Sequence, residues 1–96
     1  MKQLSKQDVI NTIQKNPNYD SFFETDESER KRSIICDVAN IQVRFFMSLG
    51  TIDYNYLQNP APGTVDMNEV LEFCSIAKQF LSEEALRRGN ATFSQL

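Results

Sequence analysis

The chain has 96 residues, of which 41% are hydrophobic and 24% are charged, and its formal net charge at pH 7 is −3. This length and composition indicate one folded domain, residues 1–96, and exclude intrinsic disorder. The negative charge argues against a generic nucleic-acid binder, because affinity for phosphate backbones comes mainly from lysine and arginine. The absence of histidine removes the most common general base near neutral pH and the most common metal ligand.

The first predicted element is a helix over residues 5–15. Ser5 is a suitable N-cap, and Asp8 stands three residues later, where a capping box places its acid. Apolar residues then recur on one helical face: Val9, Ile10 and Ile13. Pro17 ends the helix, because the residue before a proline is pushed out of helical geometry. The aromatic-rich residues 16–25 are expected to form a turn and one further helical turn.

A second, longer helix is expected over residues 26–49. Asp26 and Glu29 have the spacing of a capping box, and Gly50 follows as a stop residue. The polar side chains of this segment fall in one stripe of a helical wheel: Asp37, Asn40, Arg44 and Ser48. The remaining apolar surface is wider than the stripe of roughly 100° that a surface helix buries. We therefore expect this helix to be central or to carry a second interface.

A third helix is expected over residues 66–88, after a long connector over residues 51–65. The connector contains prolines and aromatic residues, and Ile52, Tyr54 and Tyr56 alternate as they would in a strand. Because one strand has no partner in an otherwise helical chain, a loop or a short helical turn is preferred.

The predicted fold class is all-α. A short N-terminal helix precedes two long helices that pack antiparallel, and Asp66 begins the third helix, with Glu69 as its capping-box partner. Residues 90–96 are expected to form a flexible polar tail. The long connector is expected to fold back over the helices or to reach a partner.

The sequence lacks the residues and motifs on which catalysis usually depends. All three glycines stand where turns or helix ends are expected, so none remains for a phosphate-binding loop. Cys36 and Cys74 lie on apolar arcs and are expected to be buried, reduced thiols in a cytoplasmic protein. The sequence shows no secretory signal and no apolar run long enough to cross a membrane. We therefore predict a protein that is not an enzyme and that holds no cofactor and no metal.

One basic cluster is the only candidate footprint for DNA, Arg30-Lys31-Arg32. Acidic residues precede it directly: Glu24, Asp26, Glu27 and Glu29. We interpret the cluster as a solvated, self-compensating stretch at the start of a helix, so nucleic acid is not expected as a partner.

Several aromatic and polar residues are candidates for an interface. Gln42 falls inside the apolar arc, where it either bonds a loop of its own chain or acts as a polar specificity element in a contact between helices. Phe22 and Phe23 are expected in the core. Tyr54 and Tyr56 are expected at the surface, because a tyrosine at an interface can bury its ring and keep its hydroxyl in contact with water. The candidate interface residues are Tyr19, Gln42, Val43, Met47, Tyr54 and Tyr56.

Together these features predict a non-catalytic protein–protein interaction module. It would act as an adaptor, an inhibitor or a small assembly subunit, of the accessory kind that viruses and phages encode. The wide apolar arc over residues 26–49 predicts a homodimer through that helix, with Cys36, Val43 and Met47 in the contact. The alternative is a protein that binds a small ligand in a pocket between helices, lined by Phe and Tyr side chains with Gln42 and Arg44.

Overall fold

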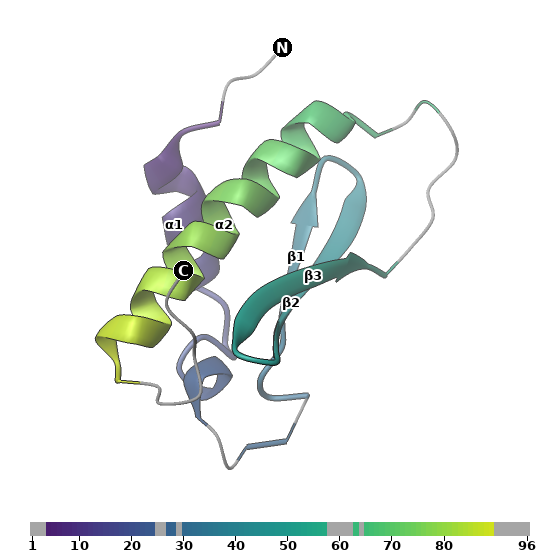
Figure 1. Ribbon diagram of the computed structural model, residues 1–96. Helices are drawn as coiled ribbons and strands as arrows, with labels where there is room; N and C mark the ends of the chain where they lie inside the picture. The colour runs from purple at the N-terminus through teal and green to yellow at the C-terminus, as the bar shows by residue number, and fades with distance from the viewer. Residues whose placement is uncertain (1–3, 25–26, 29, 58–62, 64, 90–96) are drawn as a thin grey trace.

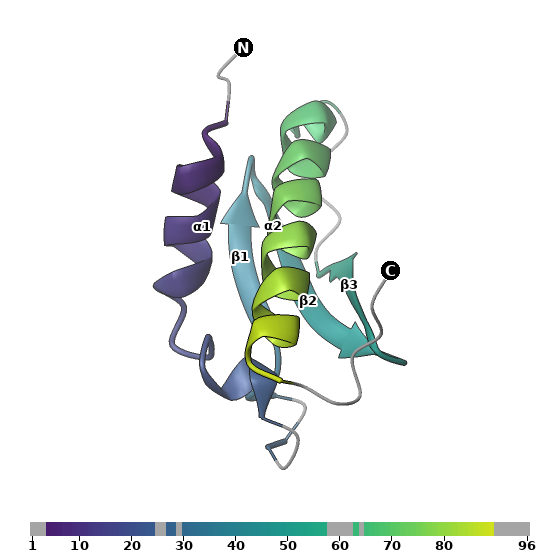
Figure 2. The same ribbon diagram turned by 60° about the vertical axis from the view of Figure 1, so that its left-hand side comes forward.

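The computed structural model describes residues 4–24, 27–28, 30–57, 63 and 65–89. Its elements in chain order are α1 (Lys6–Gln14), the 3-10 turn η1 (Ser21–Phe23), β1 (Ile34–Val38), β2 (Ile41–Ser48), β3 (Thr51–Tyr56) and α2 (Met67–Arg87). The strands form one antiparallel sheet with the order β1-β2-β3, and both α-helices lie on the same face of it (Figures 1 and 2). The fold is therefore α+β, and the prediction of an all-α helical bundle is wrong.

The predicted helix over residues 26–49 is replaced by a hairpin of β1 and β2. Ala39 and Asn40 connect these strands with φ values of 46° and 70°. Two positive φ values in a two-residue connection define a type I′ turn, whose twist matches the strands on either side. Gly50 does not end a helix but closes a second such turn, with Leu49, before β3. The proposed capping pair, Asp26 and Glu29, lies outside the described residues.

The hairpin forms because this segment alternates between two environments. Its buried side chains face the helices: Ile34, Cys36, Val38, Ile41, Val43 and Phe45. The side chains between them, such as Asp37, Gln42 and Arg44, point to the other face of the sheet. The polar positions 40, 44 and 48 lie four residues apart, a spacing that suits a helical stripe and one face of a strand equally. The high content of β-branched residues favours the strand.

The connector predicted over residues 51–65 begins with a strand. The alternation of Ile52, Tyr54 and Tyr56 did indicate β3, which pairs with β2. The preference for a loop was wrong because a helix over residues 26–49 would leave this strand without a partner, whereas β2 supplies one. The pairing continues one residue beyond β3, where the Leu57 N–H donates to the Gln42 carbonyl oxygen at 3.0 Å.

The two α-helices agree with the predicted ranges 5–15 and 66–88 to within one residue at each end. The Ser5 hydroxyl accepts from the Asp8 N–H at 3.4 Å. Asp66 accepts from the N–H groups of Asn68 and Glu69 at 3.1 and 3.2 Å. These caps depend only on neighbouring residues, so the helix starts can be found from sequence. The predicted tail, residues 90–96, lies outside the described residues.

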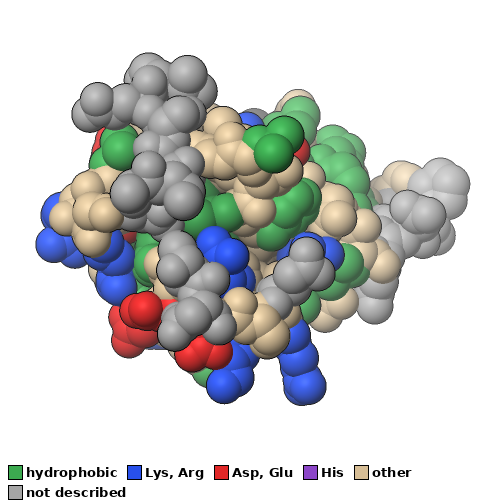
Figure 3. All heavy atoms as spheres, turned by 60° about the horizontal axis from the view of Figure 1, so that its bottom comes forward, with side chains coloured by type: hydrophobic (Ala, Val, Ile, Leu, Met, Phe, Trp, Pro, Cys, Tyr) green, Lys and Arg blue, Asp and Glu red, His purple; other side chains and the backbone are tan. Residues whose placement is uncertain are grey.

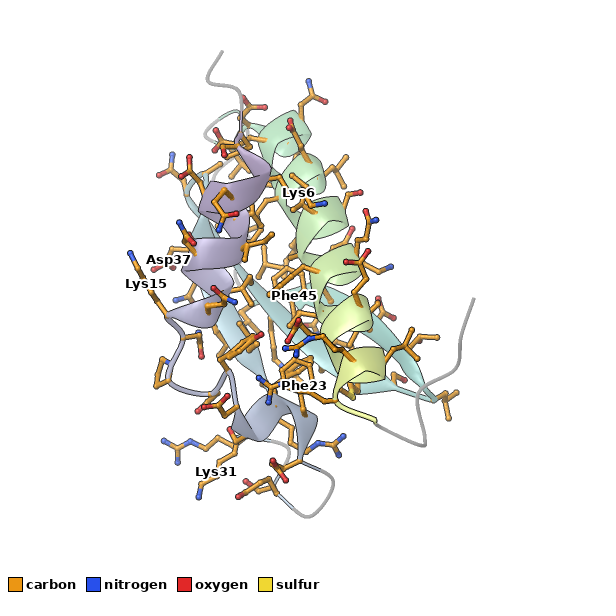
Figure 4. All side chains as sticks on the ribbon, turned by 90° about the vertical axis from the view of Figure 1, so that its left-hand side faces the viewer. Lys6, Lys15, Phe23, Lys31, Asp37 and Phe45 are labelled. Carbon is orange, nitrogen blue, oxygen red and sulfur yellow. The ribbon has the colours of Figure 1, made fainter. Side chains whose placement is uncertain are left out.

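The core lies between the helices and the sheet. Figure 4 shows Phe45 pointing from β2 into this space and Phe23 near the C-terminal end of α2. Phe22 and Phe23 of η1 are both buried, as expected. The helices contribute the following buried residues: Val9, Ile13, Val70, Phe73, Cys74, Ala77, Leu81 and Ala85. One face of the sheet is thereby covered, and the other carries the surface described next.

Candidate functional site

The structure separates the predicted interface residues instead of gathering them on one surface. Val43 is fully buried, and Met47 is half-buried against the core. Tyr19 is half-buried too, because its ring stacks on Phe80 at a centroid distance of 6.3 Å. The predicted homodimer patch of Cys36, Val43 and Met47 therefore does not exist as an exposed surface.

The remaining predicted residues lie on opposite faces of the sheet. Tyr54 and Tyr56 stand on the helix side of β3, with their ring centroids 5.9 Å apart. The Lys78 ammonium of α2 lies 5.8 Å from the Tyr54 ring. Gln42 points to the opposite face, as does Arg44. These two residues consequently line no pocket between helices, which corrects that part of the ligand-binding alternative.

The face of the sheet away from the helices carries a group of side chains that we call the arginine face. Apolar and basic groups alternate on it, and no described helix covers it (Figure 2). Ile35 and Leu57 are 44% and 42% exposed. The arginine face consists of Arg30, Arg32, Ser33, Ile35, Arg44, Phe46 and Leu57.

Two adjoining recesses are present in the arginine face. The larger has a volume of about 340 Å³, and its lining residues are Arg30, Ser33, Ile35, Arg44 and Leu57. The smaller has a volume of about 80 Å³, and its lining residues are Arg32, Ser33, Arg44, Phe46 and Met47. Both recesses share Ser33 and Arg44, and each is lined by one further arginine, Arg30 in the larger and Arg32 in the smaller.

Arg44 is held in place by its neighbours on the sheet. Its Nε donates to the Ser33 hydroxyl oxygen at 3.2 Å. Its guanidinium carbon lies 4.8 Å from the centroid of the Phe46 ring, within the range of a cation–π contact. Ser33 is buried beneath these groups. The Arg44 side chain is therefore positioned before any ligand arrives, which lowers the entropic cost of binding.

Arg32 has poor hydrogen-bond partners in the described structure. Its terminal Nη2 reaches the Met47 sulfur at 3.7 Å, and a thioether is a weak acceptor. Its Nε is buried and has no hydrogen-bond partner among the described residues. A buried donor without an acceptor is unfavourable.

The segment 30–33 is fixed by the turn that follows α1. The Asn18 side-chain amide donates to the carbonyl oxygens of Arg30 at 3.2 Å and Ser33 at 3.0 Å. The Ser21 hydroxyl donates to the Lys31 carbonyl oxygen. Figure 3 views the molecule from this end and shows Lys and Arg side chains beside hydrophobic ones. These hydrogen bonds from the turn after α1 thus fix the backbone from which the Arg30 and Arg32 side chains extend.

The charges near this face are only partly compensated within the described residues. Lys31 pairs with Glu27 at 3.7 Å, but residues 30–32 form a turn before β1 and not the start of a helix as predicted. Arg30, Arg32 and Arg44 have no carboxylate within ion-pair distance in the part of the chain that the structure describes. Asp37 and Asp53 are exposed on the same side of the sheet. Positive charge is therefore concentrated around Arg44, with negative charge toward both sheet edges.

The cysteines offer little reactivity. Both are free and buried. Burial is the main cause that raises the pKa of Cys36 to about 12 and the pKa of Cys74 to about 11. Both thiols stay protonated near neutral pH, whereas a nucleophile or a metal ligand needs the thiolate. Among the described residues, no three acidic or cysteine side chains cluster closely enough to hold a metal ion.

No family model, no curated protein and no solved structure matches this chain. The described helices include none with the length and apolar character needed to cross a membrane. Sequence reasoning named Arg44 but missed Ser33, Ile35 and Leu57 as its neighbours. A search for alternating residues between two-residue turns would have placed Ile35 and Arg44 on the same face of a hairpin.

Proposed function

We propose that the protein is a non-catalytic module that docks a short segment of another protein on its arginine face. The exposed apolar side chains of Ile35 and Leu57 next to the arginines carry this proposal. A partner segment would cover them with its own apolar side chains and place an acidic group against Arg44. Arginine is enriched among the residues that dominate binding energy in interfaces, and the apolar contacts around it exclude water.

The chemistry of the rest of the chain supports a binding role over catalysis. The thiols are buried and protonated, and the chain has no histidine. Free cysteines in β1 and α2 also favour a reducing compartment, so we propose that the protein works in the cytoplasm. The net charge of −3 and the exposed Asp37 and Asp53 favour a protein segment over a nucleic-acid backbone.

Selection of short random peptides by display on the folded protein tests this proposal. We expect the selected peptides to combine apolar residues with acidic ones. Their binding should shift the backbone NMR signals of Ile35, Arg44 and Leu57. Because the attraction is partly electrostatic, added salt should weaken it.

Matched variants make the test specific. Leu57→Gln removes an apolar side chain from the arginine face, whereas Leu71→Gln makes the same change at a residue of α2 that is 49% exposed. We expect Leu57→Gln to weaken peptide binding about tenfold, equivalent to about 1.4 kcal/mol, and Leu71→Gln to leave it unchanged. Equal effects of the two substitutions, or peptides that bind elsewhere, would contradict the proposal.

A further inference from the structure

The smaller recess of the arginine face has the character of an anion site. Arg32 and Arg44 both line it, so two arginine side chains border one space of about 80 Å³. One water molecule occupies about 30 Å³ in the liquid, so the recess can hold a small polyatomic anion. The Arg32 Nη2 reaches the Met47 sulfur, a weak acceptor, at 3.7 Å and can donate to a stronger acceptor in the recess.

We infer that this recess binds the phosphate group of a phosphorylated side chain in the docked segment. The inference rests on the proposed docking function and names the chemistry of its anchor. Arg32 and Arg44 would hold the phosphate oxygens, and the apolar side chains of the larger recess would hold the residues next to it. Clusters of arginine are a recurrent means of recognising phosphorylated segments.

A phosphate matches this arrangement better than a carboxylate does. One guanidinium fork satisfies both oxygens of a carboxylate. A phosphorylated side chain carries a charge of roughly −1.5 to −2 near neutral pH and has three strong acceptor oxygens, so it can bond two arginines together. Arg30, across the larger recess, adds a third positive charge nearby.

A single phosphate is also favoured over a nucleic-acid backbone. A strand of nucleic acid needs a basic track that accompanies several successive phosphates. Here the three arginines line two adjoining recesses, and both Asp37 and Asp53 are exposed on the same face. A polyanion that ran across the sheet would meet these carboxylates.

The test uses the full chain and three probes followed by NMR at constant ionic strength. The probes are O-phosphoserine, sodium acetate and an oligothymidylate. We expect O-phosphoserine to give saturable shifts centred on residues 32–34 and 44–46, with an affinity about tenfold or more above that of acetate. Linear shifts that never saturate, equal affinity for acetate, or oligothymidylate affinity that rises with strand length would overturn the inference.

Variants locate the site. Arg44→Gln and Arg32→Gln should each weaken O-phosphoserine binding about tenfold, because charge-assisted hydrogen bonds are lost. Arg44→Lys keeps the charge but loses the fork, and it serves if a neutral variant fails to fold. Arg87→Gln makes the same change at an exposed arginine of α2 and should have no effect. If Arg44→Lys and Arg87→Gln bind equally well, the recess is not the site.

The two proposals fail in different ways. If selected peptides bind the arginine face but a phosphorylated residue gives no advantage, the docking function stands and the phosphate anchor is wrong. If O-phosphoserine binds the recess but no peptide binds the face, the anchor stands and the docking function is wrong.

Discussion

Leu81 and Leu71 belong to the same helix but have opposite surroundings. Leu81 is fully buried between α2 and the sheet, whereas Leu71 is 49% exposed. We expect Leu81→Ala to lower the free energy of unfolding by about 2–5 kcal/mol, because it removes buried methyl groups and leaves a cavity. Phe73→Ala should cost a similar amount, as Phe73 is also buried. The helical periodicity of the sequence places Leu81 and Phe73 on the core face.

The urea midpoint of unfolding measures this prediction, with Leu71→Ala as the matched control. The control makes the same chemical change in the same helix and should shift the midpoint far less. A Leu81→Ala midpoint equal to that of the control would contradict the placement of this helix face. The comparison removes any effect of helix propensity, because leucine and alanine are exchanged in both variants.

Cys36 and Cys74 should be protected from alkylation while the protein is folded. Burial raises both pKa values, to about 12 and about 11, so little thiolate forms in the folded state. We expect iodoacetamide to label neither thiol at about pH 8 until denaturant is added. Because the unfolded chain loses these protons first, stability should also fall as pH rises above about 9. Rapid labelling of the native protein would contradict this prediction.

At the scale of elements, the turn between β2 and β3 holds a residue poorly suited to its geometry. Leu49 has a φ of 52° and its side chain is fully exposed. Residues other than glycine, asparagine and aspartate are strained there. We expect Leu49→Asn to raise the free energy of unfolding by about 0.5–1 kcal/mol, because it relieves this strain without loss of packing.

Thermal unfolding measures this change, and Gly50→Ala supplies the opposite control. Gly50 has a φ of 79°, so the added Cβ should lower the melting temperature. A lower melting temperature for Leu49→Asn would contradict the assignment of a type I′ turn.

Glu84 joins the C-terminal end of α2 to the turn after α1. It accepts from Arg87 Nη2 at 2.6 Å and from the Tyr19 hydroxyl at 3.2 Å. The hydrogen bond from Arg87 is the main cause that lowers the pKa of Glu84. Arg88 completes the contact, with its guanidinium 4.4 Å from the Phe23 ring centroid. This carboxylate thus links the last turn of α2 to the segment between α1 and η1.

The lowered pKa of Glu84 predicts a pH-dependent contribution to stability. The contribution is fully present above the ordinary glutamate pKa and is lost as the pH falls through the lowered value in the folded state. We expect Glu84→Gln to reduce the urea midpoint near neutral pH and to have little effect at about pH 2. Glu83→Gln, which changes an exposed neighbour, is the control. An equal loss for Glu84→Gln at both pH values would contradict the charge-based origin.

At the scale of the whole molecule, the structure does not contain the apolar helix face from which the homodimer was predicted. Cys36 and Val43 are buried within one chain, and Met47 packs against the same core. Dimer formation stays a prediction, to be measured by sedimentation equilibrium, but its contact would use a different surface.

Met47→Glu separates a role in folding from a role in association. We expect it to lower the melting temperature equally at low and high protein concentration, because it brings a carboxylate against the core of one chain. If Met47 instead lies in a dimer contact, the melting temperature of the parent protein should depend on protein concentration. Met47→Glu should then remove that dependence. Leu71→Glu, at an exposed helix position, is the control and should change little.

The sequence alone determined those features that depend on neighbouring residues. Ser5 and Asp66 cap helices through bonds to groups two or three residues away, so α1 and α2 could be located from the chain itself. The absence of histidine is likewise a property of the sequence itself. Arg44 was also named from sequence, but as part of a pocket between helices, whereas it lies on the opposite face of the sheet.

Only the tertiary structure decided the sheet and the surface that it carries. A strand is stabilised by a partner elsewhere in the chain, so residues 34–48 and Thr51–Tyr56 could be assigned only together. A helical wheel gave one apolar arc to these residues, whereas pairing divided them between a face covered by helices and an open one. That division buries Val43 and brings Arg32, Ser33 and Arg44 around one recess. The site exists because strand pairing joins residues that are distant in sequence.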